Sequence, residues 1–136
     1  AFQNKVRFSG LQGDEELVIG LVNSNTQNPL EEIKVNDQWV VLLTHDMQTY
    51  EREWWLGLAI IVPRELYLGY TEAPTSGKLS NSFLAKLKVE DNKPVTYYAA
   101  AGWELSDERF KDPDFFRNYV ENLVKQLSAE VEVTIK

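Results

Sequence analysis

A histidine, two tyrosines and several arginines and tryptophans near expected strand ends could support acid–base chemistry in this chain of 136 residues. His45 is the only histidine; it follows an apolar run and has Asp46 beside it. Because imidazole changes charge near neutral pH, His45 is a candidate base, or a ligand to a sugar hydroxyl. The sequence favours the simpler interpretation, an ordinary loop histidine, because the pattern specifies no partner for it.

Tyr97 and Tyr98 are neighbours in the apolar stretch that runs from Thr96 to Ala101. Successive strand residues face opposite sides, so at most one of the two hydroxyls reaches any one face. Either tyrosine is a candidate catalytic acid. The favoured interpretation is a core tyrosine whose hydroxyl is satisfied at the rim.

Trp103 and Glu104 leave the same stretch directly after Gly102. An exposed indole at that place would stack on the apolar C–H face of a sugar ring, and Glu104 could act as an acid. The alternatives are a tryptophan that caps the core beneath a helix, which we favour, and a solvated glutamate.

A second aromatic and cationic group lies between Arg52 and Arg64. Trp54 and Trp55 are adjacent, so one is expected in the core while the other lines a groove with Arg52. A guanidinium there can hold a carboxylate through two parallel hydrogen bonds, and Arg64 is the second candidate for that role. Further aromatic residues in the surrounding loops would extend this surface: Tyr50, Tyr67 and Tyr70.

Composition disfavours several classes of function. The chain has 14 Lys and Arg against 21 Asp and Glu, a net charge of −7, and no basic stripe, which argues against nucleic acid and anionic membranes as partners. One histidine and no cysteine argue against a typical zinc site. The acids Asp112 and Asp114 are explained by helix capping, and the acidic loop at 14–16 lacks a calcium-ligand series. We therefore expect no metal and no cofactor.

The elements that would position these residues are mostly strands. Two continuous apolar runs, Gln38–Thr44 and Trp54–Val62, are typical of strands covered on both faces. Asn81–Val89 and Pro94–Ala101 flank a short turn and predict an antiparallel hairpin. Further strands are expected at Asn4–Phe8, Glu16–Val22, Glu31–Val35 and Glu65–Tyr70, with a loop from Thr71 to Gly77.

The periodicity changes to 3.6 after Trp103. Asp112 as N-cap and Pro113 at the first helical position predict where a helix begins, and an apolar stripe runs from Phe115 to Leu127. Glu130–Lys136 then alternates and predicts a terminal strand. The whole chain, residues 1–136, is predicted to be one mainly β domain: an antiparallel β-sandwich with one C-terminal helix followed by that strand.

Two segments, Leu56–Pro63 and Lys93–Glu104, carry a family resemblance. They resemble the C-terminal half of a bacterial polysaccharide-utilisation β-sandwich family of unknown function, domain of unknown function 4861. The resemblance implies a supersandwich like that of galactose-mutarotase-type domains, and relatives that include an oligosaccharide dehydratase. Asn81 and Ser82 stand where a histidine is expected in the family.

The resemblance implies part of a carbohydrate-active protein that processes uronate-containing oligosaccharides by elimination, a carbon–oxygen lyase of dehydratase or polysaccharide-lyase type. Such chemistry needs a base, a group that neutralises the carboxylate and a proton donor. Our candidates are His45, Tyr97 and Tyr98 for catalysis, and Arg52, Trp54, Arg64, Trp103 and Glu104 for substrate binding.

The expected partner is an oligosaccharide or polysaccharide, in the periplasm or outside the cell. Because the chain begins at Ala1-Phe2, a second chain or an N-terminal segment is expected to complete a larger sandwich, of which this chain is the C-terminal portion. The alternatives are a non-catalytic carbohydrate-binding or structural module, and a β-sandwich that binds proteins.

Overall fold

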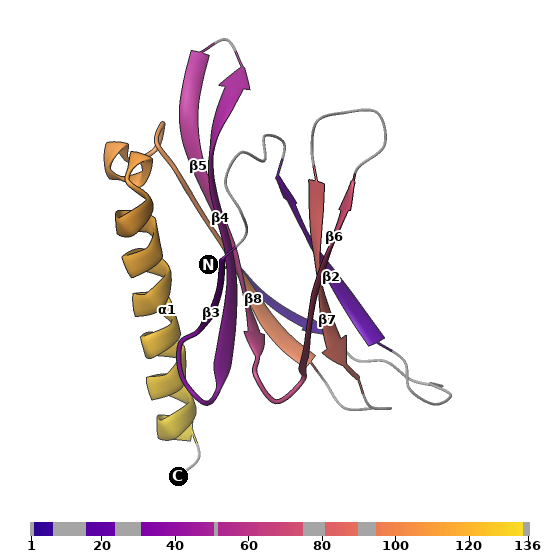
Figure 1. Ribbon diagram of the computed structural model, residues 1–136. Coiled ribbons are helices and arrows are strands. Elements are labelled where there is room, and N and C mark those ends of the chain that lie inside the picture. Colours follow the sequence, from indigo (N-terminus) through magenta and orange to yellow (C-terminus); the bar gives the residue numbers. More distant parts are fainter. Residues whose placement is uncertain are drawn as a thin grey trace.

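The computed structural model describes residues 2–6, 16–23, 31–50, 52–74, 81–89 and 95–134. They form three layers: one helix, a five-stranded sheet and a three-stranded sheet, with the larger sheet in the middle (Figure 1). The large sheet contains, in spatial order, β1 (Phe2–Val6), β8 (Val95–Trp103), β5 (Arg52–Pro63), β4 (Trp39–Tyr50) and β3 (Glu31–Lys34). The small sheet contains β2 (Glu16–Asn23), β7 (Asn81–Lys88) and β6 (Tyr67–Pro74). Every strand pair is antiparallel, so the predicted mainly β sandwich with a C-terminal helix is confirmed.

Strands β4 and β5 bury both of their faces, as their continuous apolar runs predict. Alternate residues face opposite sides of a sheet, so each strand contributes to two cores. The inter-sheet core contains Val40, Leu42, Ile60, Val62 and, from the small sheet, Ala85 and Leu87. The core under the helix contains Val41, Leu43, Ala59, Ile61, Phe116, Val120 and Val124.

The β4–β5 hairpin is longer than the apolar runs indicate. Its register extends from the pair Trp39 and Pro63 to the pair Tyr50 and Arg52. His45 therefore lies inside a strand, and the interpretation of it as a loop histidine is wrong. The polar residues after Thr44 misled the prediction because backbone pairing does not depend on side-chain polarity. For the same reason β6 continues to Pro74, through residues 71–74 of the expected loop.

The predicted hairpin between β7 and β8 is also wrong. Strand β7 pairs with β2 and β6, whereas β8 pairs with β1 and β5, so the two strands belong to different sheets. Each has neighbours on both sides, which satisfies its backbone hydrogen bonds. Val89 and Val95, at the two ends of the connection, both lie in the inter-sheet core. The alternation in each strand thus predicts correctly which residues face inward. The inward faces of β7 and β8, however, oppose each other across the sandwich.

Two helical segments follow β8: the short 3-10 helix η1 (Glu108–Lys111) and the helix α1 (Pro113–Thr134). The start of α1 is confirmed, because Asp112 Oδ1 accepts a hydrogen bond of 3.0 Å from the backbone N of Asp114. The predicted terminal strand is wrong as far as Thr134, where the chain is still helical; residues 135–136 lie outside the described part. No glycine or proline follows Leu127, and extending a formed helix avoids the cost of nucleation.

Glycines allow the helical segments to approach the large sheet closely. Gly57 and Gly102 are partners in the register of β5 and β8. A Cβ on Gly57 would lie 2.5 Å from the ring of Phe116, and a Cβ on Gly102 would lie 2.5 Å from the ring of Phe110. The two rings therefore occupy the space that side chains would otherwise fill, and η1 is held against the end of the sheet.

Candidate functional site

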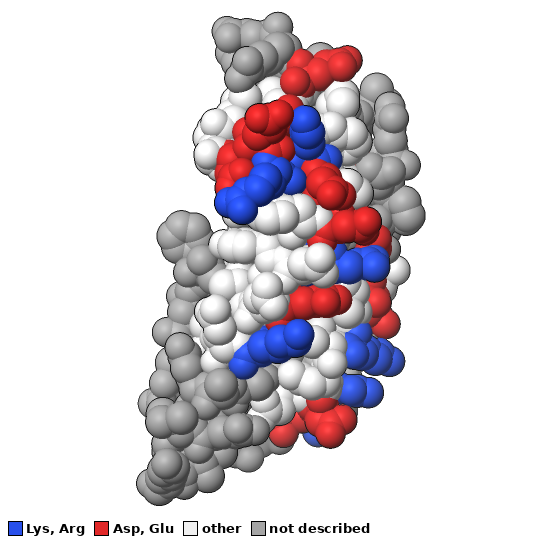
Figure 2. All heavy atoms as spheres, turned by 90° about the vertical axis from the view of Figure 1, so that its left-hand side faces the viewer, with Lys and Arg blue, Asp and Glu red and all other residues white. Residues whose placement is uncertain are grey.

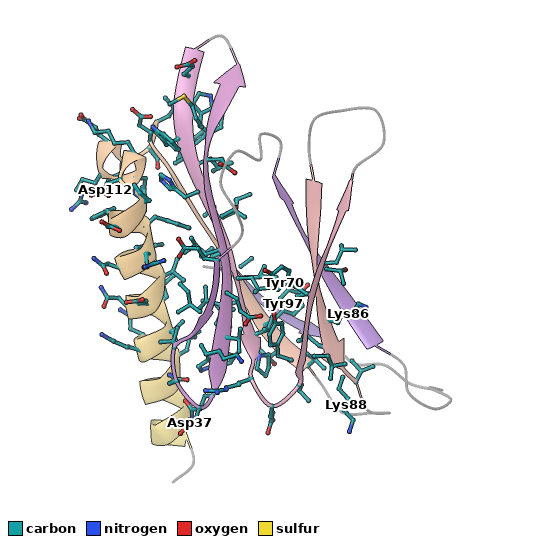
Figure 3. All side chains as sticks on the ribbon, in the orientation of Figure 1. Asp37, Tyr70, Lys86, Lys88, Tyr97 and Asp112 are labelled. Carbon is teal, nitrogen blue, oxygen red and sulfur yellow. The ribbon has the colours of Figure 1, made fainter. Side chains whose placement is uncertain are left out.

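A pocket of about 460 Å³ lies where the start of α1 meets the large sheet. We call it the helix-face pocket. In Figure 3, Asp112 labels the end of α1 at which the pocket lies. Its lining comes from β3, β4, β5 and the first turns of α1: Glu31, Leu43, His45, Trp55, Pro113, Asp114 and Arg117.

His45 is held in one orientation in this pocket. Its exposed fraction is 6%. Its Nε2 lies 2.7 Å from the backbone oxygen of Phe110, and since a carbonyl can only accept, Nε2 carries a hydrogen and donates it. In the neutral ring, the lone pair is then on Nδ1. The imidazole also stacks on Trp55, with ring centroids 5.0 Å apart and an interplanar angle of 11°.

The carbonyl that holds His45 belongs to η1, whose own start is capped. Asp107 Oδ1 accepts a hydrogen bond of 3.0 Å from the backbone N of Arg109. The side-chain hydrogen bonds from Arg109 lower the pKa of the Asp107 carboxyl. A capped η1 presents the Phe110 carbonyl to His45 at a fixed position.

Glu104 positions the aromatic wall of the pocket. Its Oε2 accepts a hydrogen bond of 3.0 Å from the backbone N of Trp55. Its own backbone N donates to the backbone oxygen of Trp55 at 2.9 Å. Glu104 thus extends the pairing of β5 with the end of β8 beyond Trp103, and its carboxylate oxygen serves as the acceptor for the Trp55 backbone N.

Arg117 pairs with Glu31 at the pocket, joining α1 to the edge strand β3. Both side chains are 43% exposed. The helical periodicity predicts Arg117 only as part of the polar face. Arg117 follows Asp114 by three residues, so the two lie on the same side of α1. Glu31 is 86 residues away from Arg117 in the sequence, so no local signal identifies this pair.

Acidic and basic side chains are interspersed over the helix side of the molecule, as Figure 2 shows. A uniform long-range field of one sign is therefore not expected around the pocket. Local charge decides what enters it: two carboxylates, Glu31 and Asp114, and one guanidinium, Arg117.

Trp54 and Trp103 contact each other on the other face of the large sheet. Their rings meet edge to face, with centroids 5.5 Å apart, and 43% of Trp103 is exposed. Because Gly102 faces η1, the next residue points away from the helix. Trp103 therefore does not cap the core beneath the helix, contrary to our favoured interpretation.

The other predicted site residues lie apart from the helix-face pocket. Tyr97 packs in the inter-sheet core; Figure 3 labels it beside Tyr70. Tyr98 faces the helix and contacts Trp39 at 5.7 Å between ring centroids.

The two predicted arginines lie at opposite ends of β5. Arg52 begins the strand, and its side chain lies outside the described part. Arg64 follows the strand and donates from Nη1 to the backbone oxygen of Asn36 at 2.8 Å. Twelve strand residues span about 40 Å, so the two arginines cannot hold the same carboxylate.

Of the predicted site residues, the structure brings two together at this pocket. His45 lines it, and Glu104 acts on it through Trp55. Trp55, Arg117, Glu31 and Asp114 complete it. Among the described residues, no group of three histidines and acids is placed to hold a metal, and no helix is long and apolar enough to cross a membrane.

Comparisons with known proteins point to one family. A family model described as "Domain of unknown function (DUF4861)" matches residues 1–133. An uncharacterized protein, P7, of Formosa agariphila is 25% identical over 126 residues; the match covers 93% of this chain and 30% of that protein. The chain thus spans less than a third of the length of this curated relative. No solved structure matches. The family match covers almost the whole chain, and the protein therefore belongs to the family DUF4861, a domain of unknown function.

Proposed function

We propose that this chain is part of a carbohydrate-active protein that binds uronate-containing oligosaccharides in the helix-face pocket and acts on them by elimination. The observation that carries the proposal is a histidine stacked on a tryptophan in a pocket that an arginine also lines. The indole of Trp55 offers an apolar wall to a sugar ring. The guanidinium of Arg117 suits a carboxylate. His45 supplies an imidazole that can take up a proton and return it.

The proposed step removes water from the uronate. Nδ1 of neutral His45 takes the proton on the carbon next to the carboxylate, while Arg117 stabilises the charge that develops on the carboxylate oxygens. A carbon–carbon double bond forms as the carbon–oxygen bond of the neighbouring hydroxyl breaks. The imidazolium returns the proton to the departing oxygen, which leaves as water. The products are one unsaturated oligosaccharide and one water molecule.

Glu31 has a defined place in this proposal. Its carboxylate already pairs with Arg117, so a bound uronate would take over that position. Since two carboxylates repel when they share one guanidinium, Glu31 has to turn away when the substrate binds.

Binding is the first test. Isothermal titration calorimetry with an oligogalacturonide should give saturable heat, and the neutral oligosaccharide of equal length should give much weaker binding. Arg117→Gln should weaken oligogalacturonide binding by about tenfold or more, because a charge-assisted hydrogen bond contributes roughly 1.5–3 kcal/mol. Lys125→Gln, an exposed cation on the same helix, is the matched control and should bind like the parent. Equal losses in the two variants would count against a role for Arg117.

Turnover is the second test. The double bond conjugated to a carboxylate absorbs in the ultraviolet, so product formation can be followed directly. His45→Gln retains a side-chain N–H donor for the Phe110 carbonyl but lacks an imidazole, and it should abolish product formation while binding persists. An unsaturated product that accumulates equally with His45→Gln would overturn the role of His45.

A non-catalytic carbohydrate-binding module is the second candidate function. It is favoured by the exposure of Trp103 beside Trp54 and by the use of His45 Nε2 as a donor to a backbone carbonyl. In that case the oligosaccharide binds without turnover, Trp103→Ala removes binding, and Arg117→Gln has little effect. Under either candidate we propose a periplasmic or extracellular location, where polysaccharide fragments occur.

A further inference from the structure

Strand β3 is an edge strand that is held from both of its faces. It comprises the four residues Glu31–Lys34, lies last in the spatial order of the large sheet and pairs, among the described strands, with β4 alone. Figure 1 shows it beside α1. Successive residues of a strand face opposite sides, so the neighbours Glu31 and Glu32 point to different layers of the molecule.

Each of the two glutamates joins β3 to another layer. Glu31 pairs with Arg117 of α1. Glu32 Oε2 accepts a hydrogen bond of 2.5 Å from the hydroxyl of Tyr67. Tyr67 belongs to β6 in the small sheet, and its ring packs against the inter-sheet core. One short strand therefore ties the helix, the large sheet and the small sheet together.

The two ends of β3 are anchored by different kinds of contact. Ile33, in the second half of the strand, packs against the core under the helix. At the start of the strand, the side chain of Glu31 is 43% exposed and Glu32 is exposed as well. Polar contacts that water can reach contribute little to stability, because water competes for the same groups. The start of β3 is therefore the end that opens at the lower cost.

The closed position of β3 occupies the helix-face pocket. Glu31 and Arg117 both line the pocket, and the Glu31 carboxylate is paired with the guanidinium that a carboxylate ligand needs. Because Glu31 and Glu32 are adjacent, a backbone movement that takes Glu31 away from α1 also shifts Glu32 relative to Tyr67. The hydrogen bond between Tyr67 and Glu32 thus stabilises the occupied state from the opposite face of the sheet.

We propose that β3 is a latch on the helix-face pocket. In the ligand-free protein Glu31 is a built-in competitor for Arg117, and Tyr67 holds the strand closed through Glu32. A carboxylate ligand replaces Glu31 on Arg117 and opens the latch, so its apparent affinity is lowered according to the fraction of molecules that are closed. The identity of the ligand rests on the proposed function, whereas the latch is a property of the ligand-free fold.

Hydrogen exchange of the ligand-free protein tests the latch. Arg117→Gln and Tyr67→Phe should each speed the exchange of the β3 amides by about two- to fivefold, as expected for the loss of one exposed polar contact. Lys125→Gln on the same helix as Arg117 and Tyr70→Phe on the same strand as Tyr67 are the matched controls, because both side chains are exposed. The amides of β8, inside the large sheet, should exchange as in the parent. Exchange of β3 that neither variant accelerates would overturn the inference, whatever the result with the ligand.

Isothermal titration calorimetry with the oligogalacturonide tests the opening. Tyr67→Phe should tighten binding severalfold although Tyr67 belongs to the small sheet, and Glu31→Gln should tighten it further because the competing charge is removed. Tyr70→Phe should bind like the parent. Unchanged affinity in Tyr67→Phe would mean that Glu31 leaves by turning its side chain alone, which would also overturn the latch. If β3 exchange is accelerated but the oligogalacturonide binds neither the parent nor any variant, the proposed function fails and the latch stands.

Discussion

The two faces of the large sheet are built from the same strands but differ in what covers them. Toward the small sheet, the buried core is mainly aliphatic and continuous, with Leu42, Ile60 and Leu87 across from one another. Toward α1, the core also contains rings: Trp39 and Phe116 are buried, and Tyr98, Phe110 and Tyr119 pack against that core. The β4–β5 hairpin also extends beyond the start of the helix, as Figure 1 shows. The helix-face pocket lies where α1 begins, so the end of the helix cover brings polar side chains beside an apolar core.

Truncating the central side chain of each face should give the largest effects. Phe116 and Leu87 are both fully buried, so Phe116→Ala should cost about 3–5 kcal/mol of unfolding free energy and Leu87→Ala about 2–5 kcal/mol. Urea unfolding measures both. The comparison is sharpened by ligand binding: Phe116 contacts His45 at 6.2 Å between ring centroids, so only Phe116→Ala should impair the helix-face pocket. Equal impairment by Leu87→Ala would break the distinction between the faces.

Adding a side chain at Gly57, on the helix face of the large sheet, should have the next largest effect. In Gly57→Ala the new methyl would lie 2.5 Å from the ring of Phe116, and overpacking of this kind costs about 1–3 kcal/mol. Thermal unfolding measures the loss. Adding Phe116→Leu to Gly57→Ala should recover part of it, because the smaller side chain gives way. Additive losses in the double variant would show that the two positions do not compete for space.

Removing the carboxylate that holds Trp55 should have a smaller effect. Glu104→Ala deprives the backbone N of Trp55 of its acceptor, which should cost about 1–2 kcal/mol. Glu104→Gln keeps an amide oxygen as acceptor and should lose less. The stacking of His45 on Trp55 can be followed by the ring-current shift of the imidazole protons. An unchanged ring-current shift in Glu104→Ala would mean that Glu104 does not position the stack.

A pH-dependent contact at the edge of the inter-sheet face should give the smallest effect. Tyr67 donates a hydrogen bond of 2.5 Å to Glu32 Oε2. Burial and this hydrogen bond raise the pKa of Tyr67 above the ordinary tyrosine value. The folded state therefore retains the phenol proton more tightly than the unfolded state. The resulting stability is complete below about pH 10, the unfolded pKa, and is lost as the pH rises toward the higher folded value.

The measurement is the difference in unfolding free energy between the parent and Tyr67→Phe as a function of pH. That difference should be constant from neutral pH to about pH 10 and should shrink above it. Glu32→Gln serves as the control, because it removes the charge but keeps an acceptor, and it should reduce the slope. A difference that grows above pH 10 would contradict the direction of the shift.

The predictable part of the fold consists of features encoded within one segment. The two-sided burial of β4 and β5 follows from their apolar runs, and the start of α1 follows from Asp112 and Pro113. The pairing of β7 and β8 was mispredicted because alternation reports which residues face inward and contains no information about the neighbouring strand. The end of α1 was mispredicted because a short alternating segment is compatible with a helix that is already formed.

The candidate site was predictable only in part, for the same reason. His45 is conspicuous as the only histidine. Its partner is a backbone carbonyl 65 residues away, and a backbone partner cannot be recognised from residue types. Arg117 and Glu31 look like ordinary surface charges in the sequence, and their pairing exists only because α1 lies across the edge strand β3.

By itself, the sequence determined the class of the fold, the two-sided burial of β4 and β5 and the position at which the helix begins, because these depend on local periodicity and capping. The tertiary structure alone decided that His45, Trp55 and Arg117 meet, and that Tyr97, Tyr98 and Arg64 lie elsewhere. Contacts between distant segments depend on which strands pair and where the helix crosses them, and those choices are made by packing over the whole domain.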